Sequence, residues 1–163
     1  MEKKSIVQLD AADRAILQLL QEDAFATNKE IAAKLHLSAT PVFERIKRLE
    51  KEGFIAGYTT LLNRQSLGLS LLIYCEVSLK EHKRAFLETF EREIALLPEV
   101  MECHHITGSF DYLLKVVAQD MGDYQHFLKE KLAALDNIGR VESHFVMTEV
   151  KNTTRLPVST TPG

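Results

Sequence analysis

The chain has 163 residues, of which 45% are hydrophobic and 26% are charged, with 20 Lys and Arg against 23 Asp and Glu. These proportions are ordinary for a soluble globular protein and exclude a largely disordered chain. The longest apolar stretch, 69–75, contains a serine and is far shorter than the ~20 residues of a membrane-spanning helix. No secretory signal is expected, and two cysteines do not make a disulfide framework. We therefore expect a cytoplasmic protein with no membrane partner.

The apolar spacing up to Asn63 predicts three helices. The first is expected over about 11–21. The second begins after Thr27, because Thr27 and Glu30 have the spacing of a capping box. The third follows Ser38 as its N-cap and extends to about Glu52. Two short helices joined by a tight turn are typical of a helix-turn-helix, whose second helix enters the DNA major groove.

The third helix has one apolar and one polar face. The residues of its buried face recur at helical spacing and are Val42, Ile46 and Leu49. The opposite face presents hydroxyl and charged side chains, namely Thr40, Glu44, Arg45, Lys47, Arg48 and Lys51. Nine basic and nine acidic residues balance within 1–63, whereas 39–48 carries three cations against one anion. Such a local positive field suits phosphate contacts. A solvated face with an ion pair such as Glu44–Arg48 is an equal interpretation of this helix alone.

Strand patterns of period two alternate with helical patterns after Asn63. The expected order is a strand over 69–79, a helix over 83–97, strands over 100–107 and 110–118, a helix over 121–135 and a strand over 141–150. This β-α-β-β-α-β order is that of a ferredoxin-like domain. Leu72 and Tyr74 make the second face of the first strand partly apolar, so we expect two sheets to pack together in a two-fold dimer.

Several motifs occur in the same order across both halves: Leu-Ser-Ala-Thr-Pro-Val at 37–42, Glu-Gly-Phe-Ile at 52–55, Gly-Ser-Phe-Asp-Tyr-Leu-Leu-Lys at 108–115, and Val-Met-Thr-Glu-Val-Lys at 146–151. With them the chain resembles the Lrp/AsnC family of leucine-responsive or feast/famine regulators over residues 8–156. The resemblance implies a regulator of transcription rather than an enzyme. It also implies dimers that often assemble into octamers, with a free amino acid bound between dimers and double-stranded DNA as partner.

The resemblance completes the expected fold class, which is α+β. An N-terminal three-helix winged helix-turn-helix domain joins a C-terminal ferredoxin-like βαββαβ domain. The expected boundaries are 8–57 for the DNA-binding domain, 58–68 for a linker or short strand, 69–151 for the effector-binding and oligomerisation domain, and 152–163 for a mobile tail.

Site residues follow from the same resemblance. The implied DNA contacts are Ser38, Ala39, Thr40, Pro41, Val42, Glu44, Arg45, Lys47 and Arg48. The implied effector site comprises Ile106, Thr107, Gly108, Ser109, Asp111, Tyr112, Met121, Phe145, Val146, Met147 and Thr148. Asp111 could accept the ammonium group of an amino acid, and Gly108 would let a backbone amide approach the carboxylate. Apolar neighbours such as Ile106 would hold a nonpolar side chain.

Three positions depart from the leucine-responsive members of the family. His105 replaces an apolar residue, and Ser109 and Thr148 replace acidic ones. The effector is therefore left open between leucine, methionine and similar amino acids. No cofactor is expected, and no catalytic residue, because no nucleophile–base–orienter set is found. No metal site is expected either, because His104 and His105 point to opposite faces of a strand. The alternatives are a nucleoid-organising DNA-binding protein of low specificity and a ferredoxin-like small-molecule-binding protein without DNA function.

Overall fold

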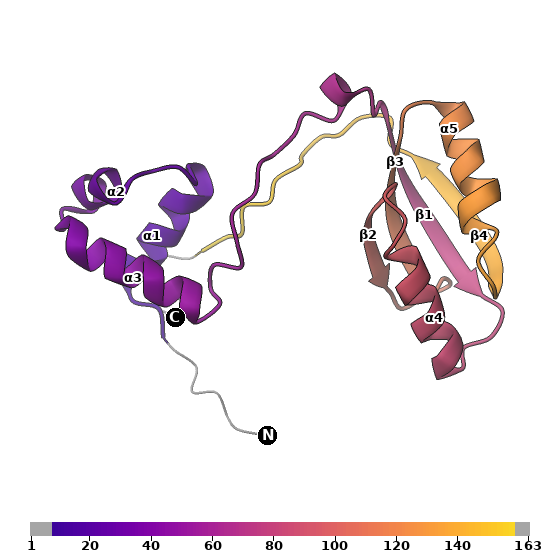
Figure 1. The fold of residues 1–163 in the computed structure, drawn as a ribbon, viewed down its shortest axis with the longest axis horizontal. Helices are drawn as coiled ribbons and strands as arrows, with labels where there is room; N and C mark the ends of the chain where they lie inside the picture. The colour runs from indigo at the N-terminus through magenta and orange to yellow at the C-terminus, as the bar shows by residue number, and fades with distance from the viewer. Residues whose placement is uncertain (1–7, 159–163) are drawn as a thin grey trace. The chain divides into compact units, whose positions relative to one another are not determined.

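Residues 8–158 are described by a computed structural model, in which the chain forms two compact units (Figure 1). The first contains residues 8–61 and 152–158, and the second contains residues 62–151. The chain thus leaves the first unit after Leu61 and returns to it with Asn152, so that two segments join the units.

The first unit is helical, as the apolar spacing predicts. Its elements are α1 (Ala11–Glu22), α2 (Asn28–Leu35) and α3 (Ala39–Lys51), and its described residues contain no strand. The predicted capping box of α2 is confirmed, because the Glu30 amide donates to Thr27 Oγ1 at 3.3 Å and the Thr27 amide to Glu30 Oε2 at 2.7 Å. Ser38 is the N-cap of α3, yet its hydroxyl makes no capping hydrogen bond. The core comprises Ile16, Ile31, Ala32, Val42, Ile46 and Leu49.

The second unit has the predicted β-α-β-β-α-β order. Its elements are β1 (Leu71–Leu79), α4 (Arg84–Ile94), β2 (Val100–His105), β3 (Tyr112–Ala118), α5 (Met121–His126), the π-helix η2 (Phe127–Leu132) and β4 (Ile138–Phe145). The four strands form an antiparallel sheet in the order β2-β3-β1-β4, and α4 and α5 cover one of its faces (Figure 1). The ferredoxin-like prediction is confirmed.

The two faces of the sheet differ in character. Inward-facing residues such as Ile73, Cys75 and Val77 of β1 pack beneath the helices in the main core. The opposite face carries Tyr74 and several ion pairs, such as Lys115 with Glu102 at 2.9 Å. This open face, which α4 and α5 do not cover, is therefore more polar than the positions of Leu72 and Tyr74 in the sequence indicated.

Several boundaries differ from the predictions. Of the linker or short strand expected over 58–68, the structure has the linker form, with a 3₁₀ helix, η1 (Gln65–Leu67), and no strand. The last strand was predicted over 141–150, but β4 covers Ile138–Phe145. Its register explains the shift, because Phe145 pairs with Ile73 near the start of β1, beyond which little partner strand remains.

Part of the predicted mobile tail is packed onto α1. Residues 159–163 lie outside the described residues, but 152–158 belong to the first unit. The Gln18 side-chain amide donates to the Val158 carbonyl at 2.7 Å, and Gln21 Oε1 accepts from the Leu156 amide at 2.6 Å. The described part of the predicted tail is thus an extended segment whose end contacts α1.

Candidate DNA-binding and ligand-binding sites

The outer face of α3 presents most of the predicted DNA contacts. The side chains exposed there are Ser38, Thr40, Pro41, Glu44 and Lys47, and Ala39 is half-buried. Val42 is a correction, because its side chain is fully buried in the core of the first unit and cannot reach DNA. The helical spacing had already assigned Val42 to the inner face, so periodicity was the better guide at this position.

Arg45 and Arg48 are engaged by carboxylates of α1. Arg45 Nη1 donates to Asp13 Oδ1 at 2.7 Å and to Asp10 Oδ2 at 2.6 Å, and Arg48 Nη2 donates to Asp13 Oδ2 at 2.5 Å. Among the described residues Arg48 therefore pairs with Asp13 and not with Glu44, the partner that the solvated-face interpretation proposed. Both arginines keep part of their side chains exposed, 30% for Arg45 and 41% for Arg48.

The start of α2 adjoins the outer face of α3. Thr27, Asn28 and Lys29 line a shallow pocket together with Thr40 and Phe43. Free amides at helix N-termini attract phosphate groups. The predicted DNA contacts did not include Asn28 or Lys29, although their position at the start of a capped helix beside a tight turn could have indicated a phosphate contact.

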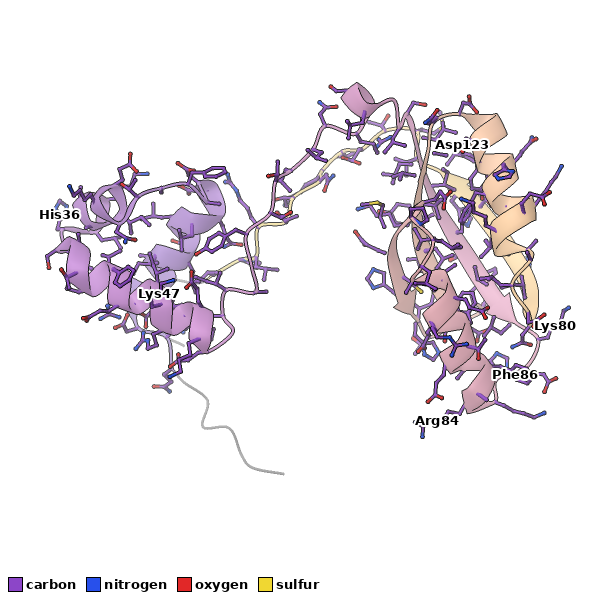
Figure 2. The ribbon with its side chains drawn as sticks, in the orientation of Figure 1. His36, Lys47, Lys80, Arg84, Phe86 and Asp123 are labelled. Carbon is purple, nitrogen blue, oxygen red and sulfur yellow. The ribbon has the colours of Figure 1, made fainter. Side chains whose placement is uncertain are left out.

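Lys47 and Phe43 extend this surface along α3. Lys47, labelled in Figure 2, is 61% exposed and its Nζ lies 2.9 Å from Glu50 Oε2. Its Nζ also lies 5.9 Å from the centre of the half-exposed Phe43 ring. A cation and an exposed aromatic ring one turn apart suit a phosphate contact and an apolar base contact, respectively.

The predicted effector residues form two groups at opposite ends of the sheet. Residues 106–111 lead into the start of β3, whereas Met121 follows its end. Phe145 pairs with Ile73, which also pairs with Val116, so residues 145–148 lie at the end of β3 near Met121. Seven residues of strand separate the groups by roughly 20 Å. A single copy of this unit therefore cannot place both groups around one amino acid.

Asp111 already has partners for both carboxylate oxygens. The Leu79 amide donates to Oδ2 at 2.7 Å, and His82 Nε2 lies 2.9 Å from Oδ1. The Ile106 amide also donates to the Asp111 carbonyl at 2.8 Å. Asp111 thus orders the loop, and an incoming ammonium group would compete with His82. Gly108 has a φ of +127°, a conformation that favours glycine.

Tyr112 is a second correction. Its ring is 1% exposed and packs against Phe90 with the ring centroids 4.6 Å apart. Its hydroxyl donates to Glu91 Oε1 at 2.8 Å, and burial together with this carboxylate raises the pKa of Tyr112. The side chain is a core element of the second unit and does not contact a surface ligand.

The second group of effector residues is largely exposed and apolar. Met147 is 96% exposed, and Met121 and Phe145 are about half exposed. The Phe145 ring meets Tyr124 edge-on at 5.2 Å between centroids, which fixes its orientation. Val146 is half-buried, and its amide donates to the Leu72 carbonyl at 2.9 Å. Thr148 is exposed. This surface suits a nonpolar ligand or a second protein copy.

Three potential metal ligands meet on the open face of the sheet, which the sequence did not indicate. Donor atoms of Glu76, Glu142 and His144 lie within 4.8 Å of one another. Each carboxylate already has a protein partner, because His144 Nε2 lies 3.3 Å from Glu76 and Arg140 pairs with Glu142. The polar groups of this cluster therefore already have partners within the protein.

A helix-turn-helix with a cationic outer face, joined to a ferredoxin-like domain, defines a ligand-responsive DNA-binding regulator. Two family models support this class, since the winged helix-turn-helix DNA-binding model matches residues 9–56 and the Lrp/AsnC ligand-binding domain matches residues 72–156. The chain belongs to the Lrp/AsnC family of transcriptional regulators. Its relatives are regulators, which confirms the prediction that it is not an enzyme.

Individual relatives cover nearly the whole chain. The leucine-responsive regulatory proteins of Escherichia coli and Salmonella typhimurium are 41% identical over 159 residues, which is 98% of this chain and 97% of theirs. A transcriptional regulator from Neisseria meningitidis, solved as an L-methionine complex, is similar with a TM-score of 0.89 and 37% identity, covering 92% of this chain and 97% of that one. An AsnC-family regulator from Agrobacterium tumefaciens has a TM-score of 0.87 and 34% identity, with 91% and 97% covered. Within residues 8–158, no helix is long and apolar enough to cross a membrane.

Proposed function

We propose that this protein binds specific duplex DNA sequences through α3 and that a nonpolar amino acid, leucine or methionine, regulates this binding. The observation that supports this proposal most strongly is the exposed outer face of α3, which carries Lys47 and whose first turns, at Thr40 and Phe43, lie beside the capped start of α2. In this assignment Ser38, Thr40 and Glu44 face base edges, and Arg45, Lys47 and Arg48 contact phosphates. The proposed location is the cytoplasm, which is consistent with a DNA-binding regulator of this family.

The amino acid would bind where different copies of the chain meet. The support is the separation of the two groups of effector residues, which one copy holds at opposite ends of β3. A loop over 106–111 from one copy and the apolar surface of Met121 and Met147 from another would together enclose a small ligand. The leucine-responsive relatives and the L-methionine complex of the Neisseria regulator favour nonpolar amino acids.

For the assembly we propose a homodimer, with dimers joining further into an octamer. The open face of the sheet, with Leu72 and Tyr74 on it, is our proposed dimer surface. Several helix-turn-helix units on one assembly would then contact DNA together, so that weak individual contacts add through avidity. The effector would act by favouring one assembly state over another.

Two measurements test this function. A gel-shift titration with genomic promoter fragments should show salt-sensitive, sequence-selective binding. Broad binding without preferred fragments would instead indicate a nucleoid-organising role, and no binding would refute DNA recognition. Isothermal titration calorimetry should show binding of leucine or methionine but not of aspartate.

The role of Asp111 is tested by Asp111→Asn, which keeps the side-chain shape and removes the charge. We expect amino-acid binding to weaken while DNA binding is retained. His82→Ala is the matched control, because it frees Asp111 Oδ1 for an ammonium group without removing the carboxylate. Unchanged effector affinity in the Asp111 variant would show that the carboxylate does not bind the ammonium group.

A further inference from the structure

One carboxylate in the first unit is almost completely removed from solvent. Asp13, in the first turn of α1, is 1% exposed and is the sole buried charged or polar residue among residues 8–158. Besides the two guanidinium groups, its Oδ2 accepts the Asp10 amide at 3.2 Å. An isolated buried charge is unfavourable, so this carboxylate depends on its cationic partners.

The same contacts fix the direction of two long side chains on the DNA-facing helix. Arg45 and Arg48 lie three residues apart, and both are turned toward Asp13. A guanidinium has five N–H donors, and the carboxylates of α1 occupy only part of each set. Both side chains remain partly exposed, so N–H groups other than the buried Nε of Arg48 can meet a ligand in front of α3.

Arg48 shows that this arrangement is not optimised for stability alone. Its Nε is buried and has no hydrogen-bond partner among the described residues. A buried donor without a partner is unfavourable. The stem of Arg48 is therefore held against α1 at some cost, in return for a fixed position of its guanidinium group.

We propose that Asp13 is a positioning residue for DNA binding. It does not touch DNA, and it holds the guanidinium groups of Arg45 and Arg48 in the orientation in which their outward N–H groups meet phosphates. Free arginine side chains lose rotamer freedom when DNA immobilises them, and side chains already fixed by Asp13 avoid most of that loss. This inference rests on the proposed function, because it assumes that α3 is the DNA-binding surface.

The direction in which DNA affinity changes when the Asp13 charge is removed separates this role from simple electrostatics. Asp13→Asn removes a negative charge from a DNA-binding domain, and charge alone would then strengthen binding to the polyanion. If Asp13 positions the two arginine side chains, its loss weakens DNA binding instead, by about ten- to hundredfold, because DNA must then immobilise both side chains. Asp23→Asn, at the exposed end of the same helix, is the matched control and should bind DNA as tightly as the parent chain or more tightly.

A second variant covers the case in which Asp13→Asn does not fold. Asp10 is half exposed, its carboxylate contacts Arg45, and asparagine is an equally good helix N-cap. Asp10→Asn should therefore fold, lose one contact to Arg45 and bind DNA more weakly, although it too removes a negative charge.

The experiment measures the affinity of the full chain for one duplex DNA fragment by fluorescence anisotropy at 10 °C, with folding checked by circular dichroism. We expect weaker binding by each folded variant of Asp13 and Asp10, and no further loss when Asp13→Asn is added to an Arg45→Gln, Arg48→Gln chain. Unchanged or tighter binding by either folded single variant overturns the inference. If the parent and the double-arginine chain bind DNA equally, the assignment of α3 as the DNA surface fails instead.

Discussion

A phosphate contact made by Lys47 should be visible directly in the salt dependence of DNA binding. Lys47 is the most exposed of the three cations assigned to phosphate contact on α3, and its ion pair with Glu50 joins residues on the same helix surface. Such surface pairs add little to folding stability, so Lys47→Gln should leave the unfolding transition unchanged. Its effect should appear in DNA binding alone.

The expected magnitude follows from counterion release. Each phosphate neutralised on B-DNA adds about −0.9 to the slope of log affinity against log salt concentration. A dimer that binds with two α3 helices has two copies of Lys47, so Lys47→Gln should make the slope less negative by about 1.8. When the salt concentration is raised from about 50 to 200 mM, the ratio of the DNA affinity of the parent chain to that of the variant should then fall by roughly tenfold.

The assay is an anisotropy titration at several KCl concentrations with a duplex selected from a random-sequence pool. Lys80→Gln is the charge-matched control, because Lys80 is exposed and directly follows β1 in the second unit (Figure 2). An unchanged slope for Lys47→Gln, or an equal change for Lys80→Gln, would refute a specific phosphate contact.

Three further results are expected. Thr27→Ala removes the N-cap of α2 and should lower stability by about 1 kcal/mol, seen as a melting temperature lower by roughly 5 °C in calorimetry; an unchanged transition would contradict the capping role. The backbone amide of Asp13 donates to the Asp10 carboxylate and holds its pKa below the ordinary value of 3.8. The backbone amide of Thr27 does the same for Glu30, whose ordinary value is 4.5. Stability should therefore be complete above about pH 5 and fall as the pH is lowered through these values, less steeply in Asp10→Asn, as urea unfolding at several pH values would show. Burial, with the nearby Glu91 charge, raises the pKa of Cys103 from 9.0 to about 11. At pH 8, Cys103 in the native chain should therefore react with iodoacetamide about a hundredfold more slowly than in the chain unfolded in urea. Equal reaction rates would contradict this.

Local chemistry explains which elements were predictable from the sequence. The start of α2 was correct because a capping box involves only Thr27 and Glu30, three residues apart. The burial of Val42 was also visible in the helical periodicity of its segment, and the errors at Val42 and Tyr112 came from assigning both to ligand contact by family resemblance. The end of β4 could not be read in this way, because apolar residues continue beyond the point at which β1 stops pairing.

Long-range partners were the part that the sequence did not reveal. Asp13 meets Arg45 and Arg48 across 32 and 35 residues, and only the packing of α1 on α3 brings them together. Asp111 likewise finds His82 at a separation of 29 residues. A charged residue in a motif indicates a possible role, but its partners in the fold decide which of its hydrogen-bonding groups remain available to a ligand.

In the proposed function, one assembly couples the binding of an amino acid to the binding of DNA. Its most direct test is the affinity of the full chain for one selected duplex, measured by anisotropy with and without saturating L-leucine or L-methionine. We predict that at least one of them changes the DNA dissociation constant by about fivefold or more, and that DNA changes the affinity for that amino acid by the same factor. Tight amino-acid binding with no change in DNA affinity would contradict this coupling.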